Sequence, residues 1–168
     1  MCSNSITRCE DPDEEGGWAI RWLFERVYSK GELGVVDDIA TRDFVGCSTE
    51  AANTYRGPEG LKEHVIRLRT AFFGFTMEVE TIERHGLVWE VAWTARGTHE
   101  RPFLGVEPTC IIGQAGEEPH GTRIAVPGIS DVTVEDEIVH HHDMRWDMSR
   151  LRGELGRPTE NAVEEATR

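Results

Sequence analysis

The sequence is poor in lysine, with only Lys30 and Lys62 among its 168 residues. All basic residues together number 18 against 31 acidic ones, which gives a formal net charge of −13. A surface with this charge repels phosphate backbones and anionic membrane surfaces. We therefore expect neither nucleic acid nor a membrane as a partner.

Other absences narrow the function further. The four cysteines form no C-x-x-C pair and no zinc-ligand spacing, so they are interpreted as reduced thiols of a cytoplasmic protein. No apolar run approaches the length of a membrane-spanning helix, about 18 residues, and no apolar export segment follows the first methionine. There is no phosphate-binding glycine loop and no nucleophile elbow around a serine. We therefore expect no cofactor and no covalent intermediate.

The length favours one domain, because 168 residues suffice for one hydrophobic core and are too few for two. Residues 1–12 and 157–168 are polar and lack periodicity, which is typical of disordered tails. The single domain is thus predicted to span residues 13–156.

Helical patterns dominate the first half of the chain. Residues 11–31 carry a broad apolar surface and end at Gly31, which suits the position after a helix. A short helix is expected at 32–40. A third is expected at 57–73, "GPEGLKEHVIRLRTAFF", where apolar residues share one helical face.

Beyond Gly74 the hydrophobic period changes from about 3.6 to 2, which indicates strands. They are predicted at 75–83, 87–99, 122–134 and 137–147, after a brief strand at 42–46. Helices followed by a meander of strands predict an α+β fold, with the helices packed on one face of a strongly curved antiparallel sheet. The segment 105–121 is too long for a hairpin turn and is either a lid or an insertion.

Four stretches resemble, in order and spacing, the SnoaL-like polyketide cyclase family of the nuclear-transport-factor-2-like (cystatin-like) superfamily. They are "DFVG", "GPEGLKEHVIRLRTAF", "WTARGTHERPFLGVEPT" and "VPGISDVTVEDEIVHHHDMRWDMSRLRGELG". The resemblance covers roughly Gly17 to Gly156 and implies a cone-shaped fold with a pocket between sheet and helices. Counting from Ile138, it also implies that the general acid/base carboxylate is Asp143, with a histidine, His141, two residues before it.

This chain departs from the family pattern in three places. A histidine of the family's preceding strand falls at about Ile129, and the polar residue expected after "DFV" is Gly46. About ten residues are inserted around Cys110 to His120.

The run "HHHD" admits two interpretations. In a strand His140 and His142 share one face, whereas His141, Asp143 and Arg145 share the other, so three adjacent histidines do not converge on one metal ion. A site that combines His141 and Asp143 with His99 remains conceivable, but no carboxylate or histidine spacing elsewhere completes a recognisable set, so we predict no metal site. Alternation by itself favours a solvated polar face, because the opposite set, Ile138, Met144 and Trp146, is more apolar. The resemblance implies instead that the polar set lines the pocket.

Further candidates would complete such a pocket, although each is equally consistent with ordinary core. The aromatic wall is predicted from Trp22, Tyr28, Trp89, Trp93 and Phe103, and Ile129, Asp131 and Arg145 are added as substrate-binding residues. His99 ends the odd-numbered series of the second long strand and faces the same way as its two tryptophans. It would either donate a hydrogen bond to an enolate oxygen or serve a structural role.

Three functions remain open. The first is a cofactor-independent acid/base enzyme acting on a small to medium hydrophobic carbonyl compound, by aldol (ester) cyclisation, with Asp143 as base, His141 orienting it and His99 stabilising the oxyanion. The second is an epoxide hydrolase or isomerase, in which Asp131 and Arg145 would help Asp143 to activate water. The third is a binding module without chemistry. A two-fold homodimer is expected, because an open sheet leaves one face exposed.

Overall fold

The computed structural model describes residues 16–51, 54–108 and 121–156. The first helix begins as α2, Gly17–Arg21, and continues as a π-helix, η1, Trp22–Tyr28. Its wider winding is visible in the Ser29 N–H, which donates to the carbonyl of Phe24 five residues earlier. π-helical turns are rare and concentrate at functional sites. Gly31 follows with φ 72°, a left-handed conformation that suits glycine after a helix.

Two short elements and one long helix follow. η2, Leu33–Val35, is a 3₁₀ turn and leads into α3, Val36–Ile39. α4, Gly57–Ala71, begins with Pro58 in its first turn and buries one stripe of side chains, Leu61, His64, Val65, Leu68 and Ala71. The helices expected at 11–31, 32–40 and 57–73 are confirmed within the described residues, except that Ala40, Phe72 and Phe73 already belong to strands.

Six strands form one sheet in the order β2-β1-β6-β5-β4-β3. They are β1, Ala40–Ser48, β2, Tyr55–Arg56, β3, Phe72–His85, β4, Val88–His99, β5, Arg123–Glu135, and β6, Ile138–Trp146. Four of the five neighbouring pairs are antiparallel, but β1 and β6 are parallel. This corrects the prediction of a wholly antiparallel sheet. β1 and β6 are separated by α4 and the whole meander, so no hairpin constrains their relative direction.

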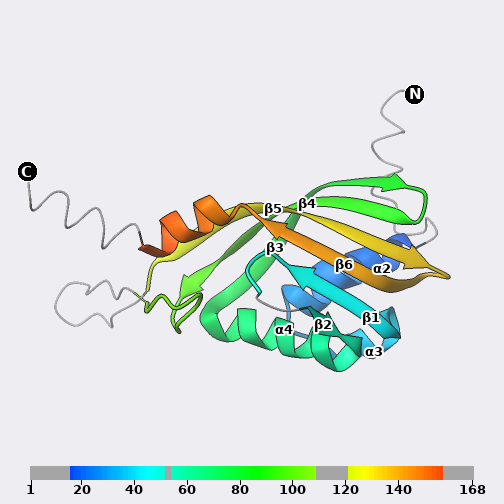
Figure 1. Ribbon diagram of the computed structural model, residues 1–168, viewed down its shortest axis with the longest axis horizontal. Helices are drawn as coiled ribbons and strands as arrows, with labels where there is room; N and C mark the ends of the chain where they lie inside the picture. Colours follow the sequence, from blue (N-terminus) through cyan, green and yellow to red (C-terminus); the bar gives the residue numbers. More distant parts are fainter. Residues whose placement is uncertain (1–15, 52–53, 109–120, 157–168) are drawn as a thin grey trace, which may run out of the picture.

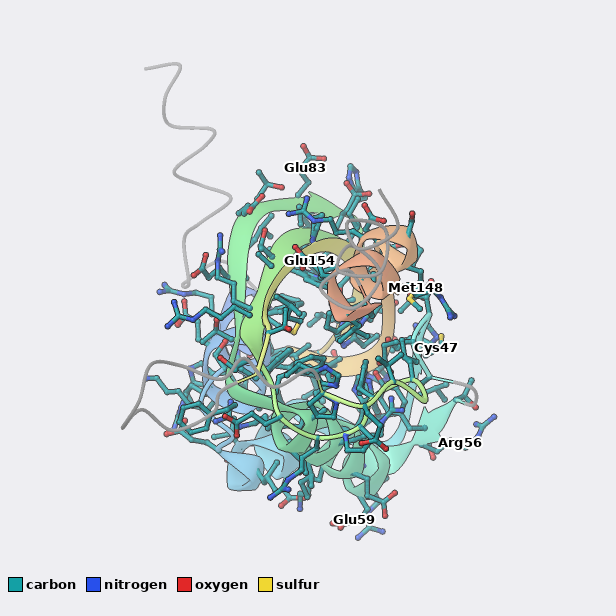
Figure 2. The ribbon with its side chains drawn as sticks, turned by 90° about the vertical axis from the view of Figure 1, so that its left-hand side faces the viewer. Cys47, Arg56, Glu59, Glu83, Met148 and Glu154 are labelled. Atoms are coloured by element: carbon teal, nitrogen blue, oxygen red, sulfur yellow. The ribbon has the colours of Figure 1, made fainter. Side chains whose placement is uncertain are left out.

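The sheet is strongly curled but not closed, because β2 and β3 are its two edges. Figure 1 shows α2 and α4 together along one side of it, and Figure 2 shows the strands arching over these helices. A further helix at residues 148–156 lies across the end of the curved sheet, where the Glu154 carboxylate accepts a hydrogen bond from the Ala125 N–H. The predicted α+β class is therefore confirmed.

The core lies between the concave face of the sheet and the helices. Its largest fully buried side chains are aromatic or aliphatic and include Tyr28, Phe24, Phe44, Phe72, Phe75, Trp89 and Trp93. No helix within the described residues is long and apolar enough to cross a membrane. The predicted tails at 1–12 and 157–168 and most of the expected insertion lie outside the described residues.

Candidate functional site

The predicted acid/base group and its neighbours lie on the outer face of the sheet. The Asp143 side chain is 39% exposed and that of Arg145 is 41% exposed. Arg145 Nη1 lies 3.0 Å from a carboxylate oxygen of Asp143 and 3.0 Å from one of Asp131. The Cys47 thiol is 3.9 Å from Asp143 Oδ1 and 4.0 Å from His141 Nε2. The structure therefore brings this set together, but on the side facing away from the helices, which corrects the facing that the resemblance implied.

The buried histidine of this strand is His142. Its exposure is 0%, and its ring lies 5.7 Å from that of Phe24 and 6.0 Å from that of Tyr28, both on η1. Met144 and Trp146 are buried on the same side of β6. The sheet register shifts between Thr133 and Val134, opposite His140, so Val139 rather than Ile138 joins this inward set. Alternation alone thus predicted the facing correctly, apart from this bulge.

The Ser130 hydroxyl links the His142 ring to Trp93. Ser130 Oγ lies 2.7 Å from His142 Nε2 and accepts a 2.9 Å hydrogen bond from Trp93 Nε1. Since an indole nitrogen only donates, the Ser130 hydroxyl is free to donate to His142 Nε2. With Ser130 donating, the ring proton of the neutral imidazole sits on Nδ1, and with Ser130 accepting a second hydrogen bond it sits on Nε2. In both tautomers Nδ1 is buried and has no hydrogen-bond partner among the described residues. Burial, followed by the charges of His64 and His141, lowers the pKa of His142 to about 3.

A second polar chain begins at Tyr28. Its hydroxyl lies 3.0 Å from His64 Nδ1, and His64 Nε2 lies 2.6 Å from Glu50 Oε1. Because an ionised carboxylate only accepts, His64 Nε2 carries a proton and donates to Glu50. In the neutral imidazole Nδ1 therefore accepts the Tyr28 proton. This carboxylate–imidazole–hydroxyl order is the arrangement that activates hydroxyl groups in many enzymes.

Glu50 lies in a turn that two hydrogen bonds connect to β6. The Thr49 N–H donates to the Met144 carbonyl, and Thr49 Oγ1 accepts a hydrogen bond from the Trp146 N–H. The Glu50 side chain is fully buried, and Arg67 of α4 forms an ion pair with its second oxygen. Burial by itself would raise the pKa of Glu50, but the hydrogen bond and charge of His64 and the charge of Arg67 outweigh it. The pKa therefore lies below the usual value.

Tyr55 explains one departure from the family pattern. Its ring stacks on His64 with centroids 4.3 Å apart and an interplanar angle of 12°. A Cβ atom at Gly46 would lie 2.0 Å from this ring. The glycine that stands where the family has a polar residue therefore makes room for the Tyr55 phenol beside the Tyr28–His64 pair. Burial raises the pKa of Tyr55.

The remaining predicted residues are distributed around this cluster. Tyr28 and Trp93 belong to it, whereas Trp22 packs against Trp18 and Arg26 at the outer side of its helix. Trp89, near the start of β4, is buried beneath the Arg84 guanidinium. His99 is fully buried next to Phe72, which also contacts Phe103. Burial lowers the pKa of His99. His99 thus faces inward as predicted, but its ring neighbour is Phe72.

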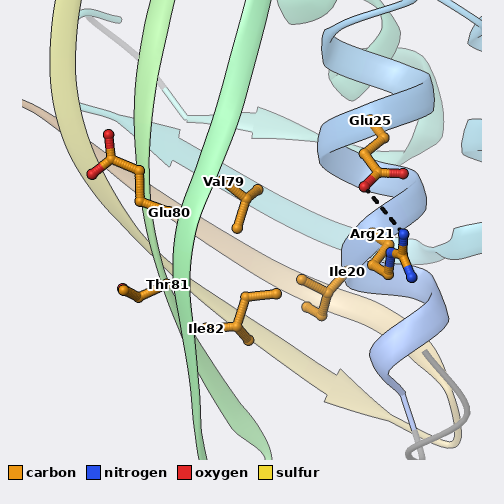
Figure 3. A pocket seen from close by; sticks show the side chains of 7 residues that line it. All are labelled: Ile20, Arg21, Glu25, Val79, Glu80, Thr81 and Ile82. Carbon is orange, nitrogen blue, oxygen red and sulfur yellow. Dashed lines mark ion pairs between the residues drawn. The ribbon is translucent and has the colours of Figure 1, made fainter. Parts of the chain in front are cut away.

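Surface pockets bear on two of the predicted regions. One of about 310 Å³ lies between the first helix and β3, with Ile20, Val79 and Ile82 inside it and the Arg21–Glu25 ion pair at its rim (Figure 3). The other, of about 460 Å³, lies on the outer sheet face and includes Ile129 and Arg145 in its lining. Ile129 is 41% exposed there. Within the described part of the chain no group of three histidine, cysteine or acidic residues is arranged to hold a metal ion.

Sequence reasoning missed five members of the buried cluster, namely Glu50, Tyr55, His64, Ser130 and His142, the last of which it placed on the face opposite the acid/base group. His64 carried a usable signal, since it lies three residues after Leu61 and four before Leu68, on the apolar stripe of α4. Ser130 carried the same kind of signal on β5, where it alternates with Val132 and Val134. Glu50 lies in a turn, and no periodicity distinguishes it from a solvated residue.

The fold defines a class: α+β proteins in which a curled sheet encloses polar groups beneath packed helices. Within that class, residues 19–155 match the sequence model of the SnoaL-like polyketide cyclase family, and the chain belongs to this family. No curated protein is similar enough in sequence to count as a relative.

Solved structures agree with the fold. A proposed SnoaL-like polyketide cyclase from Jannaschia sp. CCS1 superimposes with a TM-score of 0.70 at 20% identity, covering 84% of this chain and 91% of that one. A proposed polyketide cyclase from Acidithiobacillus ferrooxidans gives 0.72 at 16% identity, covering 88% and 98%. IdmH from Streptomyces antibioticus, also a proposed polyketide cyclase, gives 0.68 at 22% identity, covering 85% and 99%.

Proposed function

We propose that this protein is an acid/base enzyme that acts on a hydrophobic carbonyl compound held between sheet and helices, by intramolecular aldol cyclisation. The observation that carries the proposal is the buried ring nitrogen His142 Nδ1, which has no hydrogen-bond partner among the described residues, next to the Tyr28–His64–Glu50 chain. Buried polar groups are normally satisfied, and the Tyr55 hydroxyl of the same cluster is also buried without a hydrogen-bond partner in the described part of the chain. Two unpartnered polar atoms within an aromatic surrounding support a ligand-binding role. Membership of the SnoaL-like family supports the cyclase class.

The two polar groups suit the two halves of such a reaction. A proton on carbon between two carbonyl groups would pass to the Tyr28 oxygen while the Tyr28 proton moves to His64 Nδ1. Burial raises the pKa of Tyr28 well above its usual value, so both transfers must be concerted rather than begin from a tyrosinate. His142 Nδ1–H would donate to the enolate oxygen. The enolate then attacks the second carbonyl carbon, and the resulting alkoxide recovers the proton from the Tyr28–His64 pair.

Exchange of a carbon-bound proton tests this without the natural substrate. The α-protons of β-tetralone, a hydrophobic bicyclic ketone, would be followed by NMR in deuterated water. We expect the protein to accelerate exchange, and His64→Gln and Tyr28→Phe to reduce the acceleration by about 10²- to 10⁴-fold. His142→Gln should reduce it as well.

Asp143→Asn is the decisive comparison in that assay, since Asp143 is the base that the family resemblance implied. Retained exchange in this variant, with loss in His64→Gln, favours the buried cluster. The opposite result would place the chemistry on the outer face and refute the proposed mechanism. Binding of β-tetralone without any exchange would favour a binding module.

A second candidate is epoxide hydrolysis on the outer face. Its support is the bridging of Asp131 and Asp143 by Arg145, 3.0 Å from each, the two carboxylates and arginine that this reaction requires. These side chains are 37% to 41% exposed and lack the enclosure of the buried cluster. Hydration of styrene oxide that disappears in Asp143→Asn would establish this alternative.

The outer sheet face also suits a two-fold homodimer in the cytoplasm, the compartment that the cysteine pattern favours. Ile129 is exposed there beside the Asp131–Arg145–Asp143 set, in which Arg145 pairs with both carboxylates. This part of the surface is therefore less negative than the net charge of −13 would suggest. A second copy facing it would cover Ile129 and this set on both chains.

A further inference from the structure

Arg67 joins the buried cluster to the surface. Its side chain is 45% exposed, whereas the Glu50 carboxylate with which it pairs is fully buried and the His64 side chain is 2% exposed. The Arg67 guanidinium also lies 5.7 Å from the centre of the Phe103 ring. It is therefore held between the buried carboxylate and an aromatic face, an arrangement that suits arginine better than lysine.

Both carboxylate oxygens of Glu50 have a partner. One accepts the hydrogen bond of His64 Nε2–H, and the other pairs with Arg67. A fully buried carboxylate without a cation is costly and would take up a proton. A protonated Glu50 can donate to His64 Nε2 and reverse the direction of that hydrogen bond. The His64 proton would then sit on Nδ1, which could no longer accept from Tyr28.

We propose that Glu50 and Arg67 are positioning residues, which together hold the His64 imidazole in the tautomer whose Nδ1 accepts the Tyr28 hydroxyl proton. This inference rests on the proposed function for its effect on rate, but not for its effect on the tautomer. Neither residue touches the substrate in this scheme. Both act through His64, in the way that a buried carboxylate orients the histidine of a catalytic triad.

The charged and titratable groups around Glu50 set the expected pH dependence. His64 and Arg67 approach it from α4, Tyr28 from η1 and Tyr55 from β2. Among them Arg67 supplies the permanent positive charge. Its removal raises the pKa of Glu50, so the carboxylate protonates at a higher pH than in the wild type. The acid limb of the pH–rate profile should shift in the same direction.

The first experiment measures β-tetralone exchange against pH in the full chain. We expect Arg67→Met to move the acid limb upward by about one pH unit and so to lower exchange about 10-fold at pH values on that limb, with Arg67→Lys recovering part of both. Arg96→Met is the matched control, because it breaks the exposed Arg96–Glu78 pair on the sheet. An acid limb that stays in place in Arg67→Met, even with a lower melting temperature, would mean a merely structural role and overturn the proposal.

The second experiment reads the tautomer directly, from heteronuclear NMR spectra of the imidazole nitrogens. In the wild type His64 should be protonated on Nε2 and not on Nδ1, and Arg67→Met should lose this state at a higher pH than the wild type. An Nδ1–H tautomer in the wild type, or identical pH behaviour in both proteins, would overturn the inference. Absence of exchange in the wild type, with the expected tautomer behaviour, would refute the proposed function and leave this inference standing.

Discussion

The full burial of His142 predicts a pH dependence of stability. Its folded-state pKa is about 3, against 6.5 in the unfolded chain. Below about pH 6.5 the unfolded state therefore binds a proton that the native state rejects. Stability due to this residue is complete above the unfolded pKa and is lost as the pH falls from there towards the folded pKa.

The size of the effect follows from the two pKa values. Each pH unit below the unfolded pKa costs about 1.4 kcal/mol. Between about pH 7.5 and about pH 5.5 the contribution of His142 should therefore fall by about 1.4 kcal/mol. This interval stays above the isoelectric point of about 4.9, so the protein keeps a net negative charge throughout.

Urea denaturation at both pH values measures this term in His142→Gln, whose amide can still bond to Ser130. The free energy of unfolding should fall between the two pH values by about 1.4 kcal/mol less in His142→Gln than in the wild type. His140→Gln and His141→Gln, at partly exposed positions of the same strand, are the matched controls. If His141→Gln loses the slope and His142→Gln retains it, β6 faces the other way and the buried cluster is misassigned.

Two further predictions concern packing and assembly. Gly46→Ala should lower the free energy of unfolding by about 1 to 3 kcal/mol, because the added Cβ would lie 2.0 Å from the Tyr55 ring. Gly34→Ala is the control and should be nearly neutral, since a Cβ there meets no atom within 4 Å. Equal urea midpoints for the two variants would contradict this packing. Light scattering at micromolar concentration should give about twice the chain mass of 19.0 kDa, and Ile129→Glu should shift it towards the monomer. A monomeric wild type would argue against the homodimer.

Local patterns determined most of the fold. The helical period of α4 and the alternation in β3 to β6 are properties of single segments, so they were readable without knowing what each segment packs against. The inward facing of His142, Met144 and Trp146 also follows from alternation. The structure reverses the facing taken from the family resemblance, since His142, Met144 and Trp146 are buried whereas Asp143 and Arg145 are partly exposed.

Only the tertiary structure decided which polar residues meet. Glu50 comes from a turn after β1, His64 from α4, Tyr28 from a π-helix and Ser130 from β5, and no spacing along the chain relates them. The parallel pairing of β1 with β6 brings the Glu50 turn onto β6, which a wholly antiparallel meander would not do. The sequence determined which side chains point inward, since that depends on period. The hydrogen bonds between inward groups depend on which strands and helices are neighbours in the fold. No local pattern in a single sequence encodes this long-range order.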